Sequence, residues 1–227
     1  MRWDIFCQIV DNYGDAGVCW RLARALSRLS NTSSHDDIRI RLFCDDLSVL
    51  NSIARGDAIG YGATLGIEVL PWSAATSAEV LSGIGDVVIE AFACHLPESY
   101  VTAMTDRSVA PIWINLEYLT AEAWADEMHL MPSPQNNGLK KYFYFPGFTA
   151  KTGGVTLGDW HEVTTREGQQ PIPESLLKAG SQCRQDAKRI SIFNYRHAPL
   201  DDWLRLLNQA ASSCGDTADV FICAGQN

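Results

Sequence analysis

The sequence lacks an excess of basic residues. Its 227 residues include 18 Lys and Arg against 27 Asp and Glu, which gives a net charge of −9 at pH 7. Domains that bind nucleic acid usually carry clustered positive charge, so this balance argues against a uniformly basic binding surface. We therefore expect no nucleic-acid partner.

Long apolar runs are also missing. No stretch approaches the ~20 apolar residues that a membrane-spanning helix needs. The short apolar run near the N-terminus follows the charged residues Arg2 and Asp4, and it reads as a strand and not as a signal peptide. We expect a cytoplasmic protein that does not associate with membranes.

The seven cysteines form no CxxC motif. Cys7, Cys94 and Cys223 lie within apolar runs. Free cysteine behaves as a small apolar residue and disulfides are rare in the cytosol, so we expect reduced thiols in the core. The ligand spacing of a zinc site is absent, and we expect no bound metal.

Apolar runs of strand length alternate with helical patterns from the N-terminus to residue 116. The expected strands cover residues 3–10, 38–44, 67–70, 86–92 and 112–116, and the expected helices cover 17–30, 45–53, 78–81 and 97–104. The glycine-rich stretch 56–66 reads as a loop. In the first helix, the residues expected to face the core are Val18, Leu22, Ala25, Leu26 and Leu29. This alternation predicts βαβ units and a parallel, doubly wound α/β sheet.

The pattern changes after residue 116. Residues 117–158 carry several prolines and an aromatic run, which predict long functional loops and an edge hairpin. We expect a first domain at 1–160, a linker and helix at 161–188, and the beginning of a second α/β domain at 189–227. One βαβ unit cannot bury a sheet on both faces, so we expect that the chain is truncated.

The loop after the first expected strand is the strongest sign of chemistry. From residue 11 to residue 17 it reads Asp-Asn-Tyr-Gly-Asp-Ala-Gly and leads into a helix. Parallel α/β sheets bind ligands at the carboxyl ends of their strands, and the carboxylates of Asp11 and Asp15 can face the same small volume there. Capping of the helix is the alternative role for both aspartates. The glycines do not form GxGxxG, so a dinucleotide oxidoreductase is a weak interpretation.

Two more candidates follow the strand at 112–116. Glu117 and Tyr118 occupy the carboxyl end of that strand, a position where α/β folds often place functional residues. Either residue could equally serve packing. We take both as candidates for the acceptor side of a site.

The motif at residues 11–17, extended through residue 24, closely resembles the N-terminal signature of the EarP family, which are bacterial protein-arginine rhamnosyltransferases acting on elongation factor P. Other segments resemble the family as well: Asn-Leu-Glu-Tyr-Leu at 115–119, Met-Pro-Ser-Pro at 131–134, Phe-Pro-Gly-Phe at 145–148, and Thr-Gly-Gly at 152–154. The resemblance implies a GT-B glycosyltransferase fold. In that fold a Rossmann-like N-terminal domain on the acceptor side is followed by a Rossmann-like nucleotide-sugar domain.

The resemblance also implies an activity and a set of site residues. The family moves L-rhamnose from dTDP-β-L-rhamnose to an arginine of elongation factor P, with inversion and without a catalytic metal or other cofactor. By its place in the motif, Asp15 matches the general base and Asp11 matches the second aspartate required for activity. The residues that match donor-binding positions are Asn12, Tyr13, Gly14, Asp15, Phe193 and Tyr195.

Two alternatives remain open at this point. The chain could be a non-catalytic fragment that only docks elongation factor P, because its donor-binding domain is incomplete. It could also be a different small-nucleotide binder with a doubly wound sheet. Titration with dTDP separates the docking fragment from the other two interpretations.

Overall fold

The structure is a computed structural model that describes residues 1–10, 13–32, 38–155, 187–194, 198–215 and 217–223. The chain divides into two compact units, Met1–Gly158 and Asp159–Asn227. Most of the predicted linker and helix at 161–188 lies outside the described residues.

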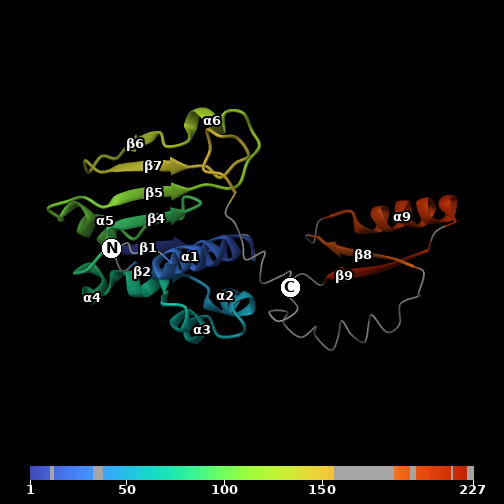
Figure 1. The fold of residues 1–227 in the computed structure, drawn as a ribbon, viewed down its shortest axis with the longest axis horizontal. Coiled ribbons are helices and arrows are strands. Elements are labelled where there is room, and N and C mark those ends of the chain that lie inside the picture. Colours follow the sequence, from blue (N-terminus) through green and yellow to red (C-terminus); the bar gives the residue numbers. More distant parts are fainter. Residues whose placement is uncertain (11–12, 33–37, 156–186, 195–197, 216, 224–227) are drawn as a thin grey trace. The chain divides into compact units, whose positions relative to one another are not determined.

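A seven-stranded sheet forms the centre of the first unit (Figure 1). Its strands, in spatial order, are β3 (Ile67–Pro71), β2 (Arg39–Cys44), β1 (Arg2–Cys7), β4 (Val87–Ala91), β5 (Ile112–Leu116), β7 (Lys140–Tyr144) and β6 (Pro132–Pro134). Neighbouring strands pair in parallel except β6 and β7, which form an antiparallel edge. The predicted α/β class, parallel sheet and edge hairpin are therefore confirmed.

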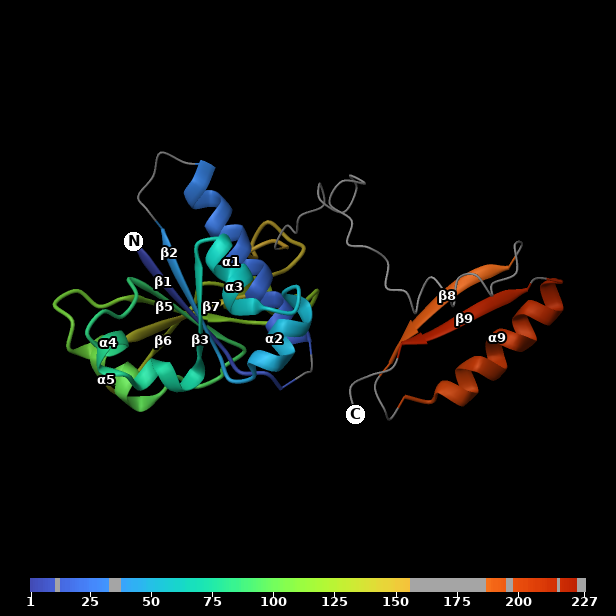
Figure 2. The same ribbon diagram turned by 90° about the horizontal axis from the view of Figure 1, so that it is seen from below.

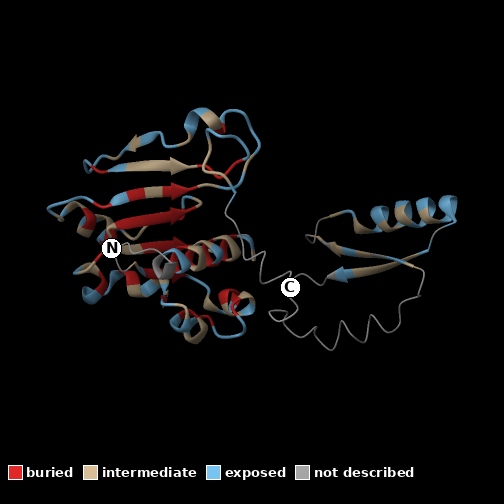
Figure 3. Ribbon diagram, in the orientation of Figure 1, coloured by how far each residue is buried: buried red, intermediate tan, exposed pale blue. Residues whose placement is uncertain are grey.

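Helices cover both faces of this sheet (Figure 2). The helices on one face are α1 (Gly14–Thr32), α2 (Leu47–Ile53) and α3 (Ala58–Thr64), and those on the other are η1 (Trp72–Thr76), α4 (Ala78–Leu81) and α5 (Glu98–Thr105). Successive side chains of a strand point to opposite faces, so Ile5 enters one core and Phe6 enters the other. The central strands β1 and β4 are accordingly buried (Figure 3), and the predicted doubly wound arrangement is confirmed.

Helix α1 begins at Gly14 and not at residue 17, which places Asp15 in its first turn. The residues it buries against the sheet are Ala16, Cys19, Trp20, Ala23 and Leu26. The predicted contact face was therefore wrong in part, since Leu29 is 55% exposed. The small side chains of Ala16, Cys19 and Ala23 on this face allow the helix axis to approach the sheet, with Trp20 and Leu26 buried beside them.

The stretch 56–66, predicted as a loop, contains helix α3. Asp57 caps this helix, because its side chain accepts a hydrogen bond from the Gly60 amide at 2.9 Å. A Cβ atom at Gly62 would lie 2.9 Å from both the Ile67 carbonyl oxygen and the Val69 side chain. Gly62 therefore serves close packing of a helix on a strand, which composition alone does not distinguish from a loop.

Gly62→Ala should lower the free energy of unfolding by about 1–3 kcal/mol, because the added methyl group overpacks the contact between α3 and β3. Urea denaturation measures this loss. Gly17→Ala is the matched control, since a Cβ there meets nothing within 4 Å. That helical substitution should be neutral or stabilise by up to ~1 kcal/mol. Equal stability of the two variants would show that α3 does not pack tightly on β3.

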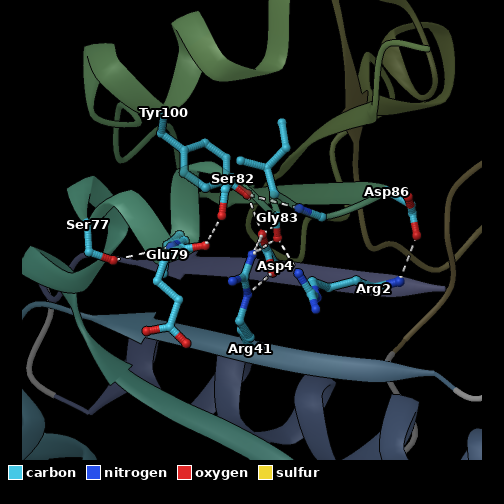
Figure 4. Close-up of polar contacts among 12 residues, drawn as sticks. Arg2, Asp4, Arg41, Ser77, Glu79, Ser82, Gly83, Asp86 and Tyr100 are labelled. Atoms are coloured by element: carbon cyan, nitrogen blue, oxygen red, sulfur yellow. Dashed lines mark hydrogen bonds and ion pairs between the residues drawn. The ribbon is translucent and has the colours of Figure 1, made fainter. Parts of the chain in front are cut away.

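A buried ionic cluster lies near the amino end of the sheet (Figure 4). Asp4 of β1 is fully buried and accepts two hydrogen bonds from Arg41 of β2, at 2.7 Å from Nε and 2.6 Å from Nη2. Asp4 also accepts hydrogen bonds from the Gly85 amide, at 2.7 Å, and from the Tyr100 hydroxyl. Burial, together with the Asp4 charge, raises the pKa of Tyr100, so its hydroxyl stays a donor. The cluster joins β1, β2, the segment before β4, and α5.

The second unit contains one parallel βαβ element. It consists of β8 (Lys188–Phe193), α9 (Leu200–Cys214) and β9 (Ala218–Cys223). Gly215 ends α9 in the left-handed conformation, with φ of 69°, as glycine commonly does after a helix. The strand–helix–strand pattern predicted from residue 189 onward is therefore confirmed.

Candidate functional site

The strand order reverses between β1 and β4. From β1 the chain winds outward to β2 and β3, whereas from β4 it winds the other way, to β5. Loops diverge at such a point, which leaves a crevice at the carboxyl ends of the strands. The loops that follow β1, β4 and β5 therefore border the place where this fold binds ligands.

Asp15 lies at this reversal point, in the first turn of α1. Its side chain is fully buried. Its Oδ2 accepts a hydrogen bond from the Val10 amide at 2.9 Å, and its Oδ1 accepts one from the Tyr118 hydroxyl at 2.9 Å. The N-terminal end of a helix also favours a negative charge. Two predicted site residues, 103 positions apart in the sequence, are thus in direct contact.

A small pocket of about 110 Å³ opens beside Tyr118. Its lining residues are Val18, Arg21, Phe92, Glu117, Tyr118, Leu119, Pro146 and Val155. The rings of Phe92 and Tyr118 stack with centroids 4.0 Å apart and planes 10° apart. An aromatic wall and the Glu117 carboxylate suit a flat cation with an apolar stem, although Arg21 also contributes a positive charge to the lining.

Glu117 is held in place at the pocket by its neighbours. Its amide donates to the Tyr144 carbonyl oxygen at 2.9 Å, and its Oε1 accepts a hydrogen bond from the Asn115 side chain. Burial raises the pKa of Glu117, and the Asn115 hydrogen bond and the Lys141 charge offset this only in part. The ionised carboxylate is therefore under-solvated, and a cation in the pocket would stabilise it.

Glu117→Gln should raise the melting temperature at pH 7. Since folding raises the Glu117 pKa, its ionised form opposes folding once the pH exceeds its unfolded value of ~4.3. Glutamine keeps an acceptor for Asn115 and removes the charge. The gain should shrink as the pH falls toward ~4, where both states bind the proton.

Thermal unfolding between pH 4 and pH 7 measures this effect, with Glu122→Gln as the control. Glu122 is an exposed glutamate close by in the sequence, and its replacement should leave the melting temperature unchanged. A lower melting temperature for Glu117→Gln at pH 7 would contradict the electrostatic assignment.

Polar side chains also join β4, β5 and β7. Glu90 is fully buried, and its Oε2 accepts hydrogen bonds from Lys141 Nζ and from Trp113 Nε1, each at 3.1 Å. The Lys141 ammonium also lies 4.8 Å from the centroid of the Trp113 ring. Sequence reasoning missed this group. The available signal was Glu90, a charge within an otherwise apolar strand.

The structure brings Asp15, Glu117 and Tyr118 to one place. It does not bring Tyr13 and Gly14 into this pocket: Tyr13 packs partly buried against the core, and Gly14 begins α1. The predicted site residues outside the described part are Asp11, Asn12 and Tyr195, together with the side chain of Phe193. Sequence reasoning missed Phe92, which no local pattern sets apart from other aromatic residues at strand ends.

Three buried thiols among the described residues, Cys7, Cys44 and Cys94, have raised pKa values. The hydrogen bond with Cys19 and burial raise the pKa of Cys7, and the hydrogen bond with Cys7 and burial raise that of Cys44. Burial raises the pKa of Cys94 to about 12. These cysteines are free and protonated, which makes them core residues, as predicted.

The described part of the chain contains neither a cluster of metal-ligating side chains nor a membrane-spanning helix. No set of three or more His, Cys, Asp or Glu side chains in the described part of the chain is arranged to hold a metal ion. No helix among the same residues has the length and apolar character required to cross a membrane.

Comparison with known proteins gives the family. The model of the family described as Elongation-Factor P (EF-P) rhamnosyltransferase EarP matches residues 3–226. A protein-arginine rhamnosyltransferase of Pseudomonas putida is 44% identical over 218 residues, which cover 93% of this chain and 55% of that protein. Its counterpart in Pseudomonas aeruginosa is 39% identical over 213 residues, covering 92% and 54%.

A third protein-arginine rhamnosyltransferase, from Shewanella oneidensis, is 43% identical over 184 residues, or 78% of this chain and 44% of that protein. The chain therefore spans about half the length of the curated relatives it matches. The match nevertheless includes nearly all of this chain, with the site loops after β1, β4 and β5 inside it. The chain thus belongs to the EarP family of rhamnosyltransferases.

Proposed function

We propose that the protein transfers L-rhamnose from dTDP-β-L-rhamnose to one arginine of elongation factor P. The reaction is an inverting, metal-independent transfer in a GT-B enzyme, of which Met1–Gly158 is the acceptor-side domain and the βαβ element begins the donor-side domain. The proposed reaction takes place in the cytoplasm. The family and the relatives named as protein-arginine rhamnosyltransferases support this activity.

The acceptor sets the chemical problem. An arginine guanidinium has a pKa above ~12 and a delocalised lone pair, which makes it a poor nucleophile. The gap of roughly 9 pKa units to an ordinary carboxylate corresponds to about 12 kcal/mol, so the carboxylate cannot deprotonate it before the reaction. Proton transfer must accompany attack. A guanidinium nitrogen bonds the anomeric carbon, the bond from that carbon to the diphosphate breaks, and dTDP leaves with the electron pair.

The contact between Asp15 and Tyr118 is the observation that carries the proposal. It ties a buried carboxylate to the wall of a pocket that also contains Glu117. In the proposed mechanism Asp15 takes the proton as the nitrogen attacks, and Glu117 holds the guanidinium by charge-assisted hydrogen bonds. Tyr118, with Phe92 stacked behind it, offers the exposed face of its ring to the guanidinium plane. Asp11 is the proposed second aspartate.

The donor half of the proposal rests on the family motif. Asn12, Tyr13 and Gly14 are proposed to contact the donor from the loop after β1. Phe193 and Tyr195 are proposed to line the donor from the end of β8. Helix N-termini and backbone amides suffice to hold the diphosphate, so the proposal needs no metal.

Mass spectrometry of elongation factor P tests the proposed function. Elongation factor P is incubated with dTDP-β-L-rhamnose and the protein expressed from its complete open reading frame. The expected product carries one deoxyhexose on a single arginine. Elongation factor P that stays unmodified would contradict the proposed transferase activity.

Calorimetric titration of this 227-residue chain with dTDP and with elongation factor P completes the test. Binding of both is expected if this chain holds enough of the donor side. Binding of elongation factor P without dTDP would identify this chain as a docking fragment, and binding of neither would overturn the assignment of the acceptor-side domain.

A further inference from the structure

The turn after β4 has a strained backbone. Phe92, Ala93 and His95 all lie in the left-handed region, with φ of 54°, 52° and 54°. None of them is glycine, so each of these conformations is unfavourable for its side chain. Such conformations persist only where the surroundings hold them, and they concentrate at functional sites.

Every amide of this turn is held by a hydrogen bond. The Phe92 amide donates to the Leu116 carbonyl oxygen at 2.8 Å, and the Cys94 amide donates to that of Ala91 at 3.2 Å. Buried side chains hold the other two. The residue 93 amide donates to Asn115 Oδ1 at 3.0 Å, and the residue 95 amide donates to Glu90 Oε1 at 3.1 Å. Strands β4 and β5 thus fix the turn in one conformation.

The turn presents the Phe92 ring to Tyr118. The two rings stack at 4.0 Å, and Tyr118 is 52% exposed, so packing elsewhere restrains its ring only in part. The hydroxyl of that same ring donates to Asp15. A side chain this exposed has several rotamers available, and the stack selects the one that reaches the carboxylate.

We propose that Phe92 is a positioning residue that holds the Tyr118 hydroxyl on Asp15. The strained turn fixes the position of the Phe92 ring, and this ring fixes the rotamer of Tyr118. The Tyr118 hydroxyl in turn orients the Asp15 carboxylate, which accepts the proton. The role in turnover rests on the proposed function, whereas the effect on Tyr118 does not. Without the ring, Tyr118 leaves Asp15 for part of the time and the carboxylate is less well aligned.

Three substitutions isolate the ring. Phe92→Gly removes the ring and favours folding of the turn, because glycine adopts a positive φ freely. Ala93→Gly relieves the same strain at the next, exposed residue and keeps the ring. Phe92→Tyr restores a ring of the same shape.

The direct readout is the NMR signal of Tyr118 in protein labelled with [¹³Cζ]tyrosine. The chain has seven tyrosines, and Tyr118→Phe identifies the signal of interest. Phe92→Gly should shift or broaden this signal, as Asp15→Asn should, whereas Ala93→Gly and Phe92→Tyr should leave it in place. An unchanged Tyr118 signal in Phe92→Gly would overturn the proposal.

Turnover of the protein from its complete open reading frame is the second readout. Phe92→Gly should lower kcat by about a hundredfold, the usual scale for a misplaced catalytic group, with KM for elongation factor P largely unchanged. Ala93→Gly should keep the wild-type kcat, and Phe92→Tyr should recover most of the kcat that Phe92→Gly loses. A wild-type kcat in Phe92→Gly would overturn the positioning role. If the Tyr118 signal responds as expected but the wild-type protein transfers no sugar, then the proposed function fails and the Phe92 contact stands.

Discussion

Asp15→Asn should lower kcat for rhamnose transfer by about 10²–10⁴-fold, the usual contribution of a positioned general base. Asparagine is nearly isosteric and keeps an oxygen that can accept a hydrogen bond from the Val10 amide or from Tyr118. It cannot take a proton from the attacking nitrogen. Affinity for elongation factor P should stay near the wild-type value, because Glu117 is the residue proposed to hold the guanidinium.

Steady-state kinetics and calorimetric titration with the same variant separate these two effects. Asp45→Asn is the matched control. Asp45 follows the neighbouring strand β2, is exposed, and accepts a hydrogen bond from the Ile9 amide at 2.9 Å. Its replacement should leave kcat unchanged. Undiminished turnover in Asp15→Asn would remove the aspartate from the proposed mechanism.

Asp4→Ala should lower the free energy of unfolding by about 3–5 kcal/mol, the usual result of removing one partner from a buried ion pair. The substitution leaves the Arg41 guanidinium buried without its two hydrogen bonds to the carboxylate. It also leaves the Gly85 amide and the Tyr100 hydroxyl without an acceptor that each uses in the native protein. A loss of this size is a large fraction of the free energy of unfolding of a whole domain, which is typically about 5–15 kcal/mol.

Urea denaturation followed by tryptophan fluorescence measures the loss. Glu68→Ala is the control, since Glu68 is an exposed carboxylate on β3 that stands beside Arg41 in register. Its removal should change stability by no more than ~0.5 kcal/mol. A loss in Asp4→Ala as small as that in Glu68→Ala would show that the cluster contributes little to the fold.

Much of the fold could be predicted because buried parallel strands read as short apolar runs. Residues 112–116 are an example, since their predicted limits coincide with those of β5. Helix α3 could not be predicted in the same way. Gly62 permits close contact with β3 at the Ile67 carbonyl oxygen and the Val69 side chain, a contact that the sequence does not display. Likewise, the spacing of apolar residues predicted helix α1. Which face of this helix is buried depends on the side-chain volumes that fit against the sheet.

The candidate site was predictable where a residue directly follows a strand. Glu117 and Tyr118 follow β5 at once, and Asp15 begins the helix after the loop that follows β1, so parallel strands bring all three to one edge of the sheet. The contribution of Phe92 was not predictable, because it depends on a left-handed backbone held by Glu90 and Asn115. Such support comes from strands that neighbour the turn in space, so no local pattern encodes it.

A double-mutant cycle tests most directly whether the pocket holds the acceptor arginine. Calorimetry measures the affinity of this chain for elongation factor P, with Glu117→Gln in one partner and replacement of the modified arginine by alanine in the other. A coupling free energy of about 1–3 kcal/mol is predicted. Either single substitution already breaks the charge pair across the interface, so the second substitution should cost less affinity than it does alone. Additive losses, with no coupling between the two substitutions, would contradict the assignment of this pocket to the arginine.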